Sequence, residues 1–178
     1  MKSFHNATQD GPAGTVTDTW LTPQWIIDAI GPFDLDPCGF YSPQHNGPVV
    51  KTANHYFTEN DDGLKQSWNL FPDKEPQMIF VNYPYSDGKK WMEKVKKEYI
   101  PNKVEIIVLN FVRSETVAWQ KNVKDATGIN LINKRIKFLD STGIERGNGN
   151  APSALIAFGE NAYKRIKNVD GILLKLDK

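Results

Sequence analysis

The sequence of 178 residues has one cysteine, no internal repeat and no long hydrophobic run. Its longest uninterrupted aliphatic run is Ile106–Leu109, whereas a membrane-spanning helix needs about 20 apolar residues. The N-terminus is polar and lacks the apolar stretch of a signal peptide. A single Cys38 excludes an internal disulfide and a zinc site built from cysteines. We therefore expect one soluble domain in a reducing compartment, without a membrane partner.

Net charge is also nearly absent, since 22 basic residues accompany 21 acidic ones. The two signs are unevenly distributed along the chain. Residues 1–75 hold 4 basic and 10 acidic side chains, whereas residues 76–178 hold 18 basic and 11 acidic side chains. A polyanionic partner would therefore meet the second part of the chain. Solvated lysine-rich helix faces produce the same imbalance, and Lys89–Lys97 fits that simpler interpretation.

The order of the expected elements predicts an α/β domain with a mixed, mostly parallel sheet and helices on both faces. Strands are expected at 33–36, 78–81, 104–111, 128–132, 135–139, 153–158 and 172–176, and helices at 22–31, 61–68, 87–99, 114–124 and 162–167. Thr22 and Ser114 are expected to cap helices. Residues 1–19 are expected to form a flexible or peripheral arm, and residues 37–54 a long loop.

Ligands of such sheets bind beyond the carboxyl ends of the strands, which directs attention to the segment Asn82–Ser86. It follows strand 78–81 directly and places a side-chain amide, a constrained backbone and an aromatic ring at that edge. An ordinary turn uses the same residue types, and short motifs occur by chance. The segment alone leaves both interpretations open.

Asn82-Tyr83-Pro84-Tyr85 resembles the Asn/Asp-Pro-Pro-Tyr/Phe signature of amino-group methyltransferases that use S-adenosylmethionine, with Tyr83 replacing the first proline. Six further segments resemble, in the same order, the phage and prophage DNA N6-adenine methyltransferases of Dam type. They are Thr22-Pro23-x-Trp25, Gly31–Cys38, Tyr56–Trp68, Arg113-Ser114, Lys134–Phe138 and Ala151–Ile156. The resemblance implies a single Rossmann-like methyltransferase domain over residues 20–178. Its cofactor-binding part would span about residues 20–75, and its catalytic and DNA-contacting part about residues 76–178.

The resemblance implies methyl transfer to the N6 amine of an adenine rotated out of DNA. That amine is a poor nucleophile because its lone pair is delocalised into the ring. Two acceptors that bind its hydrogens, here Asn82 Oδ1 and the Tyr83 carbonyl, favour a nitrogen whose lone pair points at the methyl donor. Pro84 biases Tyr83 towards extended backbone, and the ring of Tyr85 can stack on the base.

The same resemblance assigns the cofactor and DNA contacts. S-adenosylmethionine is expected at Thr22, Pro23, Asp34, Asp36, Pro37, Cys38, Phe57, Asp61 and Asp62. DNA is expected at Ser86, Arg113, Lys134, Arg135, Lys137 and Arg146. Asp36 is the natural partner for the cofactor's ammonium group. The glycine-rich loop of the wider class is missing, since only Gly39 follows the first strand. For Asp61 and Asp62 taken alone, helix capping is the simpler interpretation.

We expect no metal, because the spacing of Cys38, His45 and His55 matches no usual ligand set. Double-stranded DNA is the expected partner, and the protein is expected to be a monomer or weak dimer in the bacterial cytoplasm. The family resemblance suggests a phage or prophage origin, protection of DNA from restriction and, by analogy only, a GATC target. Three alternatives stay open: methylation of RNA amines, methylation of a protein glutamine, and a catalytically weakened nucleic-acid-binding relative.

Overall fold

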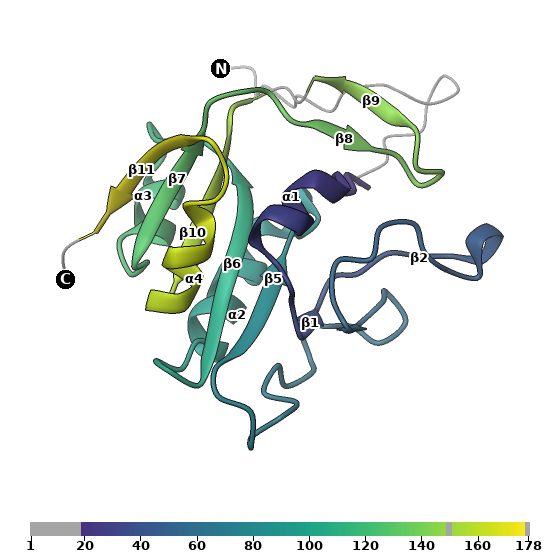
Figure 1. The fold of residues 1–178 in the computed structure, drawn as a ribbon, viewed down its shortest axis with the longest axis horizontal. Coiled ribbons are helices and arrows are strands. Elements are labelled where there is room, and N and C mark those ends of the chain that lie inside the picture. The colour runs from purple at the N-terminus through teal and green to yellow at the C-terminus, as the bar shows by residue number, and fades with distance from the viewer. Residues whose placement is uncertain (1–18, 149–150, 177–178) are drawn as a thin grey trace.

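A seven-stranded sheet forms the centre of the computed structural model, which describes residues 19–148 and 151–176 (Figure 1). Its strand order is β11 (Gly171–Lys175), β7 (Gly128–Ile132), β10 (Ser153–Phe158), β6 (Val104–Phe111), β5 (Gln77–Val81), β1 (Leu35–Asp36) and β4 (His55–Tyr56). Strands β4, β1, β5 and β6 pair in parallel, whereas β10 and β11 run antiparallel to their neighbours. Five of the seven strands share one direction, which confirms the predicted mixed, mostly parallel sheet.

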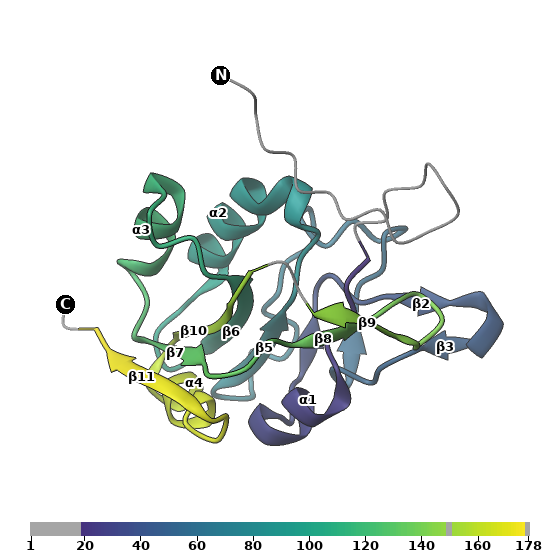
Figure 2. The same ribbon diagram turned by 90° about the horizontal axis from the view of Figure 1, so that it is seen from above.

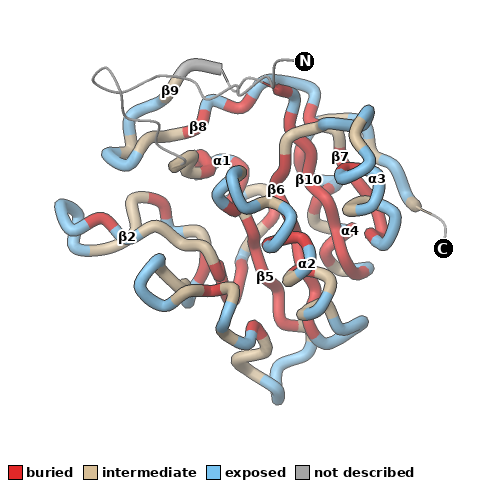
Figure 3. The backbone as a smooth tube through the Cα atoms, turned by 180° about the vertical axis from the view of Figure 1, so that it is seen from behind, coloured by how far each residue is buried: buried red, intermediate tan, exposed pale blue. Residues whose placement is uncertain are grey.

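Helices cover both faces of this sheet and form two separate layers in Figure 2. Helices α1 (Gln24–Ile30) and α4 (Glu160–Ile166) lie on one face, and α2 (Gly88–Glu98) and α3 (Val117–Val123) lie on the other. Because both faces are covered, the central strands are buried and mostly apolar. All five residues of β5 are buried, and the strands at the centre of Figure 3 are accordingly red. The predicted α/β arrangement with helices on both faces is confirmed.

The helical periodicity of the sequence explains which side each helix buries. Trp91, Met92 and Val95 lie on the buried side of α2 and join the apolar cluster that contains alternate residues of β6. Burying such a side chain contributes roughly 1.5–3 kcal/mol, so this one stripe holds α2 firmly against the sheet. On the opposite face, Ile26 and Ile30 of α1 belong to a second apolar cluster.

Two predicted helix caps are wrong. Pro23 occupies the N-cap position of α1 and no side chain closes that end, whereas the Thr22 hydroxyl binds a different group described below. Helix α3 is capped by Thr116, whose Oγ1 accepts a hydrogen bond from the Trp119 amide at 3.2 Å, and not by Ser114. Both threonine and serine suit a cap, so composition alone could not choose between them.

The helix predicted at 61–68 does not form. Asp62 has a left-handed backbone with φ of 53°, which interrupts a helix. Gly63 lies so close to Pro37 that a Cβ at this position would be 1.9 Å from the Pro37 carbonyl oxygen. The fully buried Trp68 donates its indole N–H to the Gly63 carbonyl at 2.9 Å. The segment is therefore a turn that folds around Trp68 and packs against the loop after β1.

Two short hairpins were not predicted from the sequence. The expected loop 37–54 contains β2 (Tyr41–Ser42), a 3₁₀ turn η1 (Pro43–His45) and β3 (Gly47–Pro48). The other hairpin joins β8 (Lys137–Leu139) to β9 (Glu145–Asn148), of which only β8 was expected. Each element is two to four residues long, too short for a clear period-2 pattern.

The β8–β9 hairpin lies beside the main sheet, at the top of Figure 1, and contacts the segment that precedes α1. Leu21 and Leu139 exchange two backbone hydrogen bonds of 2.9 Å. Trp20 packs edge-on against Phe138, with ring centroids 5.8 Å apart. Apart from Thr19, the predicted arm lies outside the described residues, and the division at about residue 75 stays a prediction. No helix in the described ranges is long and apolar enough to cross a membrane.

Candidate active site

A cavity of about 620 Å³ opens at the carboxyl ends of β1 and β5. The chain leaves β1 towards β4 on one side, and β5 lies on the other side of β1, so the cavity is at a topological switch point of the sheet. Ligands of open α/β sheets bind at such points. The cavity is lined by Asp36, the last residue of β1, and by residues that follow the two strands, namely Pro37, Cys38, Asn82, Tyr83 and Pro84.

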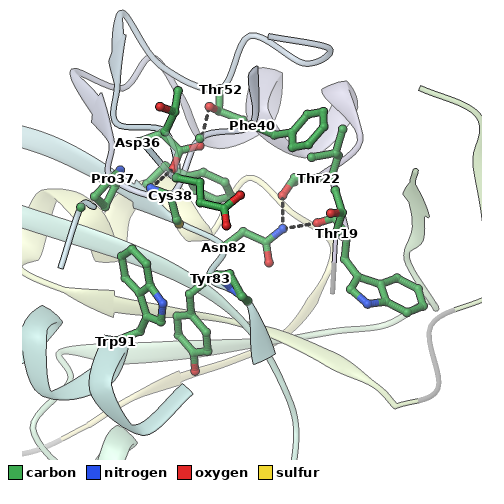
Figure 4. A pocket seen from close by; sticks show the side chains of 18 of the residues that line it. Thr19, Thr22, Asp36, Pro37, Cys38, Phe40, Thr52, Asn82, Tyr83 and Trp91 are labelled. Carbon is green, nitrogen blue, oxygen red and sulfur yellow. Dashed lines mark hydrogen bonds between the residues drawn. The ribbon is translucent and has the colours of Figure 1, made fainter. Parts of the chain in front are cut away.

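Asn82 enters this cavity with its side-chain amide held in one orientation (Figure 4). Its Nδ2 donates hydrogen bonds to the Trp20 carbonyl at 2.6 Å and to Thr22 Oγ1 at 3.0 Å. A backbone carbonyl can only accept, so the atom that faces it must be the amide nitrogen. The Asn82 oxygen is thereby turned away from the N-terminal segment, as Figure 4 shows.

The orientation of Asn82 leaves an acceptor available in the cavity. Its Oδ1 accepts a long hydrogen bond of 3.4 Å from the Tyr85 hydroxyl. Thr22 is almost fully buried at 2% exposure, so its hydroxyl is a fixed partner for the amide. An amide whose hydrogens are both bound, and whose oxygen has one long hydrogen bond, is suited to accept a further hydrogen bond from a ligand amine.

Tyr83 stands where the methyltransferase signature has proline, and its side chain anchors the backbone instead. The residue is 4% exposed, and its ring lies parallel to that of Trp91 with centroids 6.4 Å apart. Burial raises the pKa of the Tyr83 phenol, which is therefore neutral. A buried aromatic side chain restricts the backbone that carries it by packing, whereas a proline does so through its own ring.

Asp36 places a buried carboxylate on the opposite side of the cavity. Its Oδ2 accepts a hydrogen bond from Thr52 Oγ1 at 2.6 Å, and its Oδ1 accepts one from the Cys38 amide at 3.0 Å. Burial raises the pKa of Asp36 although both hydrogen bonds oppose the shift. Burial, together with the Asp36 charge, also raises the pKa of the Cys38 thiol. A cation bound beside Asp36 would restore favourable surroundings for its charged form.

A model of the DNA N-6-adenine-methyltransferase (Dam) family matches residues 12–172, which is most of the chain. The chain belongs to the Dam family. Family membership indicates an enzyme that methylates adenine in DNA at N6, and it confirms the resemblance seen in the sequence. No curated protein and no solved structure matches the chain.

The structure of this Dam-family chain brings several predicted cofactor residues together. Thr22, Asp36, Pro37, Cys38 and Asp62 all line the first cavity. Gly39 also lines it, and a Cβ there would be 2.7 Å from Tyr56 Cβ. Gly39 therefore permits close packing of the loop after β1 on β4.

Four other predicted cofactor residues do not line the cavity. Asp34 is buried, accepts a hydrogen bond from the Met78 amide at 2.9 Å and forms an ion pair with Lys74. Asp61 is exposed and accepts hydrogen bonds from the amide and hydroxyl of Thr58, which lower its pKa. Pro23 occupies the N-cap of α1, and Phe57 packs into the apolar core.

Four of the six predicted DNA-binding residues of the Dam-family chain lie on the β8–β9 hairpin and its approach, and this hairpin contacts the segment before α1 that lines the first cavity. Lys134 Nζ is 4.3 Å from the centroid of the Trp25 ring, and Lys137 forms an exposed ion pair of 3.3 Å with Glu145. Arg135 is exposed, and the Arg146 guanidinium is 4.9 Å from the centroid of the Trp20 ring. Of the other two, Ser86 lines both the first cavity and a neighbouring second cavity, and Arg113 lines only the second.

Sequence reasoning missed three groups at the site. Thr52 holds Asp36 from a loop without any motif, and the Trp20 carbonyl is a backbone atom that carries no side-chain signal. Trp91 was expected only as part of the helix at 87–99, although it also lines the first cavity. Within residues 19–148 and 151–176, no group of three or more acidic, histidine or cysteine side chains is arranged to hold a metal.

Proposed function

We propose that this protein transfers a methyl group from S-adenosylmethionine to the N6 amine of an adenine rotated out of double-stranded DNA. The oriented amide of Asn82 carries this proposal, because Trp20 and Thr22 bind its nitrogen and leave its oxygen as the acceptor, in a residue that lines a cavity with a buried carboxylate. Family membership supports adenine in DNA over RNA amines or protein glutamine. The ordered Asn82 site favours an active enzyme over a weakened relative that only binds nucleic acid.

The residues of the first cavity fit S-adenosylmethionine. A volume of about 620 Å³ is within the range of small-molecule sites, about 300–1,000 Å³. The Asp36 carboxylate suits the positively charged methionine end of the cofactor, and Asp62 offers acceptors for polar groups of its adenosine half. Rings of Phe40 and Trp91 line the same cavity and supply apolar surface for a base. When bound, the cofactor supplies an electrophilic methyl group.

The protein's own groups prepare the adenine amine for that methyl group. Asn82 Oδ1 accepts one N6 hydrogen, and the Tyr83 carbonyl accepts the other. The two bonds favour a pyramidal nitrogen with its lone pair directed away from both acceptors. Because Nδ2 of Asn82 is already bound, little reorganisation is needed when the adenine arrives. Removing one such placed dipole typically costs about 10²–10³-fold in rate.

The proposal also covers the type of fold, the contacts with DNA phosphates and the biological role of the protein. We propose that the sheet is a Rossmann-like methyltransferase fold, supported by the cavity at the switch point between β1 and β5. The hairpin cations Lys134, Arg135 and Lys137 would bind phosphates and position the duplex. Phage or prophage origin, action in the bacterial cytoplasm and protection from restriction belong to the same proposal.

A tritium-transfer assay tests the proposed reaction. The purified protein is incubated with labelled S-adenosylmethionine and, separately, with duplex DNA, single-stranded DNA, RNA or unmodified protein. We expect label in duplex DNA, as N6-methyladenine, and at least about 10²-fold less with Asn82→Ala. Calorimetry should show similar cofactor affinity for both proteins. Preferential labelling of RNA or protein, or no cofactor binding at millimolar concentration, would overturn the proposal.

A further inference from the structure

A second cavity, of about 730 Å³, lies on the other side of the segment that carries Asn82. It is enclosed by the end of β6 and by residues of α2 and α3. Tyr83 and Ser86 line both cavities, whereas Tyr85 lines only the second and Asn82 only the first. The Tyr85 hydroxyl is 3.4 Å from Asn82 Oδ1, so its ring reaches from the second cavity to the acceptor proposed for the adenine amine.

Asn110 gives this second cavity a polar floor. It is the next-to-last residue of β6, is 8% exposed and lines the cavity. Alternate residues of β6, such as Val108, pack on the α2 and α3 side of the sheet, and strand periodicity places Asn110 on that side. Within the described part of the chain no hydrogen bond holds its side-chain amide, and that amide is not one of the fully enclosed polar groups that lack a partner, so it is open to the cavity. An amide that opens onto a cavity and has no protein partner is a candidate for ligand binding.

The other lining groups match the chemistry of a nucleotide. Rings of Tyr83, Tyr85 and Trp119 surround the floor, and Lys89 and Arg113 are exposed at its rim. Aromatic rings and a side-chain amide together recognise a nucleobase, the rings by stacking and the amide by pairing with its edge. Cations at the rim suit the adjoining phosphates. One acidic residue, Glu93, also lines the cavity and lies 3.9 Å from Lys89.

We propose that the second cavity receives the ring of the adenine that is methylated, and that Asn110 determines specificity by donating a hydrogen bond to a ring nitrogen of that base. The inference rests on the proposed function. The purine would lie on the α2 and α3 side of Tyr83 with its N6 amine turned towards Asn82, while the cofactor occupies the first cavity. Asn110 and Asn82 would then bind different atoms of one base.

Asn110→Ala separates this role from a structural one. Because the amide makes no hydrogen bond in the free protein, its removal should leave the melting temperature nearly unchanged. The same change should lower kcat/KM for duplex DNA about 10–100-fold, the discrimination typical of one amide–base contact. Cofactor affinity should not change. Asn54→Ala is the matched control, since Asn54 is exposed and precedes β4 at the opposite edge of the sheet.

DNA built with 7-deazaadenine or with 1-deazaadenine in place of adenine identifies the atom. With one of these two substrates, the activity of the wild-type protein should fall as far as the activity of Asn110→Ala falls on normal DNA. The activity of Asn110→Ala should be the same on that substrate as on normal DNA. An Asn110→Ala protein that is as active as wild type, or equally sensitive to both substitutions, would overturn the inference while leaving the proposed function intact. A wild-type protein that methylates no DNA would overturn both.

Discussion

Replacing Asn82 by aspartate should disable this protein, although aspartate occupies the corresponding place in the family signature. The Trp20 carbonyl oxygen is 2.6 Å from Asn82 Nδ2 and must receive a hydrogen. A carboxylate supplies none, so the bond is lost and the carbonyl is left unpaired beside a negative charge. One such unpaired buried group costs about 1–3 kcal/mol. A free-energy difference of about 1.4 kcal/mol corresponds to a tenfold change in an equilibrium or rate constant. We therefore expect kcat/KM for Asn82→Asp to fall by about 10²-fold.

The pH profile of Asn82→Asp gives a second readout of the same contact. A protonated carboxyl can donate to the Trp20 carbonyl, so the pKa of the introduced group should be raised and activity should recover as pH falls. Thr22→Val should cost about tenfold, because one amide hydrogen then has no partner, whereas Thr22→Ser keeps the hydroxyl and should stay near wild type. Tritium transfer from S-adenosylmethionine to duplex DNA measures all three variants. Full activity of Asn82→Asp at neutral pH would refute the oriented-amide argument.

Further predictions concern the cofactor pocket, the core and the hairpin. Burial raises the pKa of Asp36, and binding of a cation needs its charged form, so the Kd for S-adenosylmethionine should fall as pH rises through this raised pKa, above the ordinary range of an aspartate. Asp36→Asn should remove this dependence in calorimetry, and persistence of the dependence would assign it to another group. Asp34→Ala should lower the free energy of unfolding by about 1–3 kcal/mol in urea without changing cofactor affinity, because the Met78 amide loses its acceptor. A weaker cofactor affinity would instead place Asp34 in the binding site. Lys137→Ala should reduce the slope of log affinity for DNA against log salt by about 0.9, whereas Lys164→Ala on α4 should not, and equal slopes for the two would exclude the hairpin contact.

The parts of the fold that could be predicted are those with long, regular patterns. Strand β6 forms with the predicted bounds, because eight residues bounded by turns and rich in Val and Ile specify a buried strand. Helix α2 follows from the periodic Trp91 and Val95. The turn at 61–68 could not be predicted, because Asp62 takes a left-handed backbone and Gly63 packs on Pro37, a contact between segments far apart in the sequence.

The candidate site shows the same limit. Asn82 and Asp36 could be predicted as site residues because each lies at the carboxyl end of a strand, at the edge of the sheet where ligands bind. Asp34 has the same side chain two residues earlier, yet it faces Met78 and Lys74. Because β1 contains only two residues, its pattern does not reveal which carboxylate reaches the cavity. The bonds that orient Asn82 come from residues about 60 positions away, and no local pattern encodes them.

Expression in a bacterium that lacks its own adenine methylation tests the central claim most directly. Host DNA is digested to nucleosides, N6-methyl-2′-deoxyadenosine is measured by mass spectrometry, and single-molecule sequencing locates the modified bases. Wild-type protein should produce the modified nucleoside within a defined short sequence, and Asn82→Ala, expressed at the same level, should produce none. Unmodified DNA in cells that contain folded wild-type protein, or equal methylation by Asn82→Ala, would contradict the account.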